Sequence, residues 1–440
     1  MQFNGYSYGV NMSRGSTMYY QCSVYRTKKK CKGKLIVKET GEHTCKAEPE
    51  PSVQDCDEEM RQLLETEAVK SPGVIPSRLW KKVGDQLAKK YPGQAMKPMK
   101  REEAINFINY VRKQANRGDE YRQIETFPTV CVSESDERSF VQFNVFYDNA
   151  GKGQRIIGMD HPDVTRLLKY PGASVFIDGT FSITPPGFQQ TLIVMVHDPT
   201  YDVYIPGLYM LVEAKDEWTN WHALHWVRVL GKMQMTPSSI TSDFEAALIK
   251  GIRDQFQGTS LIGCLFHWKQ AIRRKLIDLR IPANQIAEAM SPGVIDVLTV
   301  IPIDEIRSKG IPYVMSIVNT KGAARIWTSF WDFFVRTWMT MFPPSLWNVN
   351  TYIEQEMEMQ NRTNNPIESY NRRAKKAFGS HPTLVVFVEQ AKEEAKRYLE
   401  LLDDISMHRR VALPHADPVT LSIPPAYTAF RTPKRRKVKK

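Results

Sequence analysis

Four side chains that commonly bind metals stand close together near the N-terminus. Cys22, Cys31, His43 and Cys45 follow the pattern C-x8-C-x11-H-x-C. Thiolates and an imidazole are ligands that tetrahedral zinc prefers, and a segment of about 45 residues needs such a staple because its own apolar core is small. The pattern therefore predicts a zinc site. The alternative is four unrelated residues in a reducing compartment.

Three carboxylates lie far apart along the rest of the chain, each beside a predicted strand or helix. Asp178 follows the apolar run ASVFI, Asp243 follows SSITS, and Glu368 opens a helix in NNPIESYN. Each has an ordinary structural explanation if taken singly. Asp243 is a good helix N-cap with Glu245 in the first turn, and Glu368 suits the positive end of a helix dipole.

Taken together, the three acids suggest metal-dependent chemistry on phosphodiesters. Such chemistry holds two divalent cations about 4 Å apart, and three carboxylates supply hard oxygen ligands for them. Two Asp at the ends of neighbouring strands and one Glu from a covering helix can converge on such a site despite their separation in sequence, which is the plan of an RNase H-like fold. Gly179 and Thr180, which follow Asp178, are then expected to leave room for cation and phosphate.

The elements that must position these residues follow from hydrophobic periodicity. Short strands are predicted up to Cys45, three helices over residues 58–120, and strands followed by strand–helix alternation from about residue 138. This pattern predicts a mixed α/β sheet over residues 138–400, interrupted by a helical insertion at about 281–365. Residues 58–120 are compatible with a DNA-binding helix-turn-helix, a packing element or a dimerisation element.

Charge is concentrated at the two ends of the chain. The net charge is +12 over 440 residues, with nine Lys or Arg against four Glu in residues 1–50 and six basic residues in Lys434–Lys440. Basic ends on a nearly neutral body are expected to meet polyanions or transport receptors. The uneven spacing of six cysteines argues against a disulfide framework, and no apolar run approaches the length of a membrane span, so an intracellular protein is expected.

Residues 1–48 resemble a FLYWCH-type zinc finger. The segments FNGYSYGV, MYYQCSVYR, KKKCKGKLIV and GEHTC occur in the order of that family, although Cys45 stands where the family usually has a second His. The resemblance implies zinc bound by Cys22, Cys31, His43 and Cys45. It also implies a DNA-binding strand edge, for which the candidates are Lys28, Lys29, Lys30, Lys32 and Lys34. The alternative for these lysines is a solvated basic run.

Residues 138–400 resemble the DDE transposase domain of Mutator-like elements. FIDGTF, TSDFEAAL, GCLFHWKQAIRRKL and NNPIESYN match that family in order and spacing. The resemblance implies that Asp178, Asp243 and Glu368 bind catalytic Mg²⁺ or Mn²⁺. It assigns supporting roles to the C-x2-H pair and to polar residues around the glutamate: Cys264, His267, Asn365, Asn371 and Arg372. A zinc knuckle or SWIM segment that many relatives carry has no counterpart here, since no cysteine follows Cys264.

These resemblances lead to the expectation of a DNA transposase that binds the ends of its element and cuts and joins DNA strands. It would work on double-stranded DNA as a homodimer or larger assembly, because two ends react together. The alternatives are a domesticated, transposase-derived transcription regulator without catalytic activity and an RNase H-like nuclease that cuts but never joins.

The C-terminal residues 413–440 are expected to form an irregular basic tail. Its last segment, PKRRKVKK, resembles a nuclear localisation signal, which implies a nuclear import receptor as partner and the nucleus as location. The alternative is a basic tail that binds DNA non-specifically.

Overall fold

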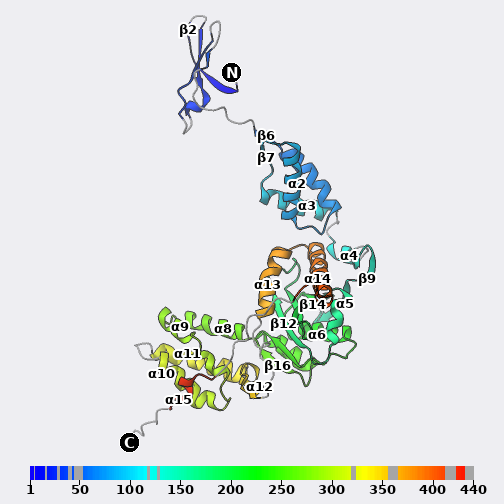
Figure 1. The fold of residues 1–440 in the computed structure, drawn as a ribbon, viewed down its shortest axis with the longest axis vertical. Helices are drawn as coiled ribbons and strands as arrows, with labels where there is room; N and C mark the ends of the chain where they lie inside the picture. Colours follow the sequence, from blue (N-terminus) through cyan, green and yellow to red (C-terminus); the bar gives the residue numbers. More distant parts are fainter. Residues whose placement is uncertain are drawn as a thin grey trace. The chain divides into compact units, whose positions relative to one another are not determined.

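The computed structural model divides into two compact units, Met1–Arg117 and Gly118–Lys440 (Figure 1). Each unit is described by itself. The structure describes residues 1–3, 5–14, 17–26, 30–37, 42–43, 53–115, 119–125, 129–318, 324–354, 365–411 and 423–431. None of the helices in this part of the chain combines the length and the apolar character that crossing a bilayer requires.

The N-terminal segment is a small antiparallel sheet with strands in chain order. Its strands are β1 (Gln2–Phe3), β2 (Tyr6–Arg14), β3 (Thr17–Cys22), β4 (Lys34–Val37) and β5 (Glu42–His43), with a 3-10 turn, η1 (Ser23–Arg26), after β3. The buried residues of this sheet form one small cluster, consisting of Tyr8, Cys22, Val24, Cys31 and Leu35. Such a small core agrees with the need for a metal staple.

Three helices follow: α1 (Asp57–Lys70), α2 (Pro76–Lys90) and α3 (Arg101–Ala115), with a short parallel pair of strands, β6 (Val53–Asp55) and β7 (Ala95–Lys97). Their shared core includes Leu64, Val83 and Ile108. Arg112 of α3 is buried and donates to the carbonyls of Ser71 at 2.8 Å and Val74 at 2.7 Å, so it ties α3 to the loop that joins α1 and α2.

The second unit is built on a seven-stranded mixed sheet in the order β10-β11-β14-β13-β12-β15-β16. In chain order the strands are β10 (Val141–Asn149), β11 (Lys152–Met159), β12 (Ser174–Thr180), β13 (Gln190–Asp198), β14 (Val203–Val212), β15 (Ser239–Ser242) and β16 (Ser260–Gly263). β12 is antiparallel to β13 and parallel to β15, and β15 is parallel to β16. Near its start lie a hairpin, β8 (Cys131–Ser133) and β9 (Asp136–Ser139), and the short helical elements α4 (Glu120–Ile124), α5 (Pro162–Thr165) and η2 (Arg166–Lys169).

Helices cover both faces of this sheet. Tyr209 of β14 packs on Phe378 and Phe387, so α13 (Asn365–Phe378) and α14 (Leu384–Ser406) cover its face. In Figure 1, α13 (orange) lies beside the green strands although nearly 200 residues separate it from β12. Met210, the next residue in β14, points to the opposite face from Tyr209. Phe143 is in register with Gly158, and Gly158 with Met210, so Phe143 lies on that opposite face. The ring of Phe143 packs on Trp226 of α6 (Glu217–Leu230). α7 (Ala246–Gln255) packs beside α6.

A second, helical core follows β16. It comprises α8 (Leu265–Asp278), α9 (Ala283–Ala289), η3 (Ile295–Thr299), η4 (Ile306–Gly310), α10 (Ile311–Val318), α11 (Ala324–Arg336), η5 (Thr337–Met341), η6 (Pro344–Leu346) and α12 (Asn350–Glu354). The expected start of the insertion at about 281 is too late. Trp268, Ile272 and Leu276 of α8 are fully buried in this helical core, so it begins at Leu265.

The expectation of an irregular segment over 413–440 is wrong for its middle part. Pro425–Ala429 form a short helix, α15, which starts after Pro424. Tyr427 of α15 is buried in the helical core, and its hydroxyl donates to Glu305 at 2.6 Å. One buried aromatic side chain therefore docks a segment whose proline content had suggested no structure. The basic motif Lys434–Lys440 lies outside the described residues.

Candidate active site

Three parallel strands bring chemistry-bearing residues to one edge of the sheet. Ile177 of β12 is in register with Ser242 of β15, and Ser242 with Gly263 of β16. The residues that follow these three are Asp178, Asp243 and Cys264. The carboxyl ends of parallel strands are where open α/β sheets place their ligands. Strand register therefore accounts for three of the residues predicted from the sequence.

Asp178 is not at the tip of its strand, as the sequence suggested. β12 continues to Thr180, and Asp178 still pairs with Ile193 of β13. Its backbone is thus held by the sheet on one side while the parallel pairing with β15 has already ended on the other. The side chain is only 5% exposed, so this carboxylate is both rigidly held and largely removed from water.

Helix α13 delivers Glu368 and Asn371 on one face. Residues three apart on a helix are neighbours, and Ile367 and Tyr370 on the adjoining face are buried in the sheet core. Asn371 Nδ2 donates to Asp178 Oδ2 at 2.7 Å. The amide thus orients one carboxylate oxygen of Asp178, as the supporting role predicted for Asn371 requires.

His267, in the first turn of α8, completes the cluster. Its Nε2 lies 3.0 Å from Glu368 Oε1 and 4.0 Å from Asp178 Oδ1. One ligand atom from each of Asp178, His267 and Glu368 lies within 4.8 Å of the others, which is close enough for one metal ion to bind all three. Asp243 lies outside this group of three. The sequence placed His267 in a supporting position, whereas the structure places it inside the cluster.

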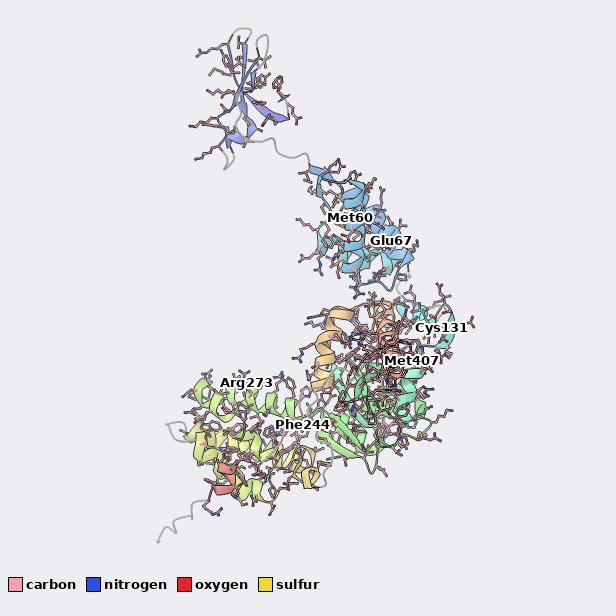
Figure 2. The ribbon with its side chains drawn as sticks, in the orientation of Figure 1. Met60, Glu67, Cys131, Phe244, Arg273 and Met407 are labelled. Carbon is pink, nitrogen blue, oxygen red and sulfur yellow. The ribbon has the colours of Figure 1, made fainter. Side chains whose placement is uncertain are left out.

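The helical core anchors the residues next to the site. Phe244, labelled in Figure 2, follows Asp243 and packs edge-on against Trp338 at 4.8 Å between ring centroids. Trp268 follows His267, is fully buried and stacks on Trp347 at 5.6 Å. Phe244 and Trp268, which adjoin two residues of the site, are therefore held by aromatic packing in the helical core. The sequence had predicted this region only as a helical insertion.

Burial dominates the electrostatics of the two aspartates. Burial, with a further contribution from Asp243 and Glu368, raises the pKa of Asp178 to about 7 against the opposing effects of His267 and Asn371. Burial also raises the pKa of Asp243, although the Glu245 N–H, which donates to Asp243 Oδ1 at 3.2 Å, opposes it. Burial thus disfavours the charged form of both aspartates, and a bound cation would stabilise that form.

His267 shows the opposite balance. Burial lowers its pKa, but hydrogen bonding to Cys264 and Glu368 and the charge of Asp178 outweigh burial and raise the pKa to about 11. The neighbouring acids therefore favour the charged form of this imidazole.

Glu245 is a functional candidate that sequence reasoning treated only as a helix-start residue. It occupies the N-cap position of α7, and its pKa is raised by burial and by the charge of Asp243. Its carboxylate is hydrogen bonded to Gln190 and Asn220, both almost fully buried. The D-x-E spacing was the available signal.

Gly179 does not leave space for a cation. A Cβ on Gly179 would lie 1.4 Å from Nε2 of Gln190, so the buried amide already fills the space beside this residue. Gly179 is required because Gln190 packs against its backbone, and the expectation about cation and phosphate was wrong.

The remaining predicted supporting residues have other surroundings. Cys264 is fully buried at the N-cap of α8. Arg372 is exposed and donates to Ser369 at 3.2 Å. The neighbouring Arg373 is paired with Glu394 at 2.9 Å. The side chain of Asn365 lies outside the described residues.

The N-terminal sheet brings Cys22 and Cys31 to the same residue. Gly33 accepts the backbone N–H of Cys22 at 3.0 Å and donates its own N–H to Cys31 Sγ at 3.4 Å. Both thiols are buried and unoxidised. An N–H aimed at sulfur is the kind of partner that stabilises a metal-bound thiolate, so the surroundings of Cys31 fit zinc. His43 pairs with Leu35 through its backbone, while its side chain and all of Cys45 lie outside the described residues.

Residues 1–49 match the family model of the FLYWCH zinc finger domain. A zinc finger domain of this family indicates structural zinc and DNA binding for this segment. No curated protein matches the chain. The predicted lysines accord with a binding edge: Lys30, Lys32 and Lys34 are exposed, whereas Cys31, Gly33 and Leu35 between and beside them are buried. Lys28 and Lys29 lie outside the described residues.

Proposed function

We propose that the chain is a DDE-type DNA transposase of the Mutator-like kind, which binds DNA through its zinc finger and cuts and joins strands at the acidic site. The observation that carries the proposal is the convergence of Asp178, His267 and Glu368, drawn from positions up to 190 residues apart, to ligand atoms within 4.8 Å of one another. Asp243 lies at the adjoining strand end. A purely structural role gives no reason for so many buried ionisable groups to meet at one sheet edge.

The topology of the sheet supports an RNase H-like fold. Strands β12, β13 and β14 form an antiparallel meander, and β15 and β16 then add in parallel on the other side of β12. The acids come from β12 where its pairing with β15 has ended, from the end of β15 and from a covering helix, which is the arrangement expected of such enzymes. The helical core interrupts the chain between the second Asp and the Glu, where the resemblance predicts an insertion.

The residues divide into metal holders and orienting groups. Asp178, Asp243 and Glu368 supply the hard oxygen ligands that Mg²⁺ or Mn²⁺ prefers. When bound, the cations would activate the attacking oxygen and stabilise the leaving one. Asn371 orients Asp178 by a hydrogen bond, and His267 pairs with Glu368.

The test is metal-dependent nicking of a duplex by the zinc-loaded full chain. We expect cleavage with Mg²⁺ or Mn²⁺, and we expect Asp178→Ala, Asp243→Ala or Glu368→Ala to lower it by at least about a hundredfold while DNA binding persists. A joining assay with a pre-cut 3′-hydroxyl end separates a transposase from a nuclease. Binding without any metal-dependent cleavage by the wild type would refute the enzyme.

That last outcome would favour a domesticated DNA-binding regulator. One observation supports this second candidate: the ion pair between His267 and Glu368 balances one proposed metal ligand with a charge from the protein itself. Titration of Mn²⁺ into the protein distinguishes the two, because a regulator needs no affinity there.

Location in the nucleus also belongs to this proposal. The support is the run of six basic residues in Lys434–Lys440, suited to a nuclear import receptor. Deleting these residues from a fluorescent fusion is expected to leave the protein outside the nucleus. Unchanged nuclear accumulation would contradict the assignment.

A further inference from the structure

Helix α2 presents a continuous basic stripe that the acidic site and the zinc finger leave unexplained. Leu79, Val83 and Leu87 are buried against α1 and α3, so the opposite face of α2 is exposed. That face carries residues at helical spacing around a shallow hollow of about 480 Å³: Arg78, Lys81, Lys82, Asp85, Gln86 and Lys89. We call these six residues the α2 stripe.

Charge of opposite sign is segregated between helices α1 and α2. Helix α2 holds five basic residues and one acidic residue, a net charge of +4, whereas α1 holds five acidic and two basic residues, a net charge of −3. A surface that serves only solubility intersperses the two signs. Two lysines of α2 form ion pairs with glutamates of α1: Lys82 with Glu67 at 2.7 Å and Lys90 with Glu59. Glu67 is labelled in Figure 2. Lys81 and Lys89 are exposed on the stripe.

The dimensions of the stripe suit a nucleic-acid duplex. From Arg78 to Lys89 a helix rises about 16 Å, and duplex DNA carries one negative charge per about 1.7 Å of its axis. Long basic side chains along one exposed helix face suit contacts with phosphates, which fix a protein on the duplex without reading its sequence. The stripe is thus suited to holding DNA without selecting its sequence.

We propose that the α2 stripe is a second DNA-binding surface that contacts the phosphate backbone of double-stranded DNA. The inference rests on the DNA binding in the proposed function and adds an interface separate from the zinc finger. Because both are in one chain, DNA held by the finger meets the stripe at a high effective concentration. The finger would select the site and the stripe would add salt-sensitive affinity.

The experiment measures binding of the zinc-loaded full chain to an arbitrary duplex of about 30 base pairs over a range of salt concentrations, by fluorescence anisotropy. Lys81→Ala/Lys89→Ala is expected to reduce the slope of log affinity against log salt by about 1.8, and to weaken binding by roughly tenfold or more near 0.1 M salt. The matched control, Lys70→Ala/Lys113→Ala, removes the same charge from exposed positions on α1 and α3 and is expected to leave the slope unchanged.

A gain-of-binding variant excludes misfolding as the cause. Asp85→Asn removes the one acidic group of the stripe and is expected to tighten binding a few-fold with a steeper salt slope. If the lysine pair and its control behave alike, or if Asp85→Asn has no effect, the stripe proposal is overturned while finger-mediated binding stands. If the wild type has no affinity for the duplex, both proposals fail. Stripe-dependent binding to polyglutamate but not to DNA would assign the surface to a protein partner.

Discussion

The zinc finger and the acidic site hold their functional residues in opposite ways. In the finger, the predicted ligands Cys22 and Cys31 are nine residues apart, and both are hydrogen bonded to Gly33, Cys22 through its backbone and Cys31 through its sulfur. In the acidic site, Asp178 comes from strand β12, His267 from the first turn of helix α8 and Glu368 from the first turn of helix α13. Among the described residues, the finger has a small buried cluster, whereas the sheet beneath the acidic site has a large one. Metal should therefore affect the two regions very differently.

The largest expected effect is loss of the finger. Cys31→Ser removes a predicted zinc ligand from a sheet whose described residues form a buried cluster of five, and structural zinc contributes on the order of 10 kcal/mol to such domains. We expect about one equivalent of zinc in the wild type, and no zinc and no specific DNA binding in the variant. Cys131→Ser, in the second unit, should keep both. Full zinc content in Cys31→Ser would remove the basis of the contrast.

At the acidic site, metal removal should lower the free energy of unfolding through the buried charge of Asp178, without unfolding the second unit. The pKa of Asp178 is about 7 in the folded protein against 3.8 for the free side chain. A raised pKa means that the stability it confers is complete below pH 3.8 and is lost as pH rises through 7. In EDTA, Asp178→Asn should therefore stabilise the second unit by up to about 4 kcal/mol at pH 8 and little at pH 4.

Calorimetry across this pH range measures the difference. Mn²⁺ should raise the melting temperature of the wild type but not of Asp178→Asn. Equal melting temperatures at pH 8 would show that this carboxylate is not strained by burial.

A smaller effect should follow from loosening the aromatic anchor. Phe244→Ala removes ring packing with Trp338 and Phe342 at a cost of about 3 kcal/mol and frees the backbone next to Asp243. Cleavage should fall more than stability alone explains. Phe330→Ala, in the same core but away from the site, should match the loss of stability and retain more of the cleavage rate. Equal rates in the two variants would mean that the helical core does not position Asp243.

The smallest effect compares one glycine from each region. Gly179→Ala must displace the buried amide of Gln190 and disturb its bond to Glu245, at a cost of about 1–3 kcal/mol. Gly9→Ala in β2 meets nothing within 4 Å and should be neutral. Thermal unfolding of both variants measures the difference, and a neutral Gly179→Ala would show that Gln190 moves freely.

The sequence predicted that the two aspartates lie near strand ends, because each follows a short run of strand-forming residues. It also found Glu368, whose helix start was visible in NNPIESYN. It ranked His267 too low, since a lone histidine at a strand-to-helix junction carries no sign of what faces it. It misjudged Gly179 for the same reason: Gln190, which fills the space, arrives from the neighbouring strand β13.

The sequence by itself determined the locally coded features: the ligand spacing and FLYWCH resemblance of the finger, the alternation of lysines with buried residues after Cys31, and the strands that end near Asp178 and Asp243. Only the tertiary structure decided which distant groups meet. Strand register aligned Asp178 with Asp243, helix phase turned Glu368 and Asn371 inward, and aromatic packing behind Phe244 and Trp268 placed His267 beside the acids. Periodicity reports the environment of one residue, whereas a site depends on contacts between residues that no local pattern encodes.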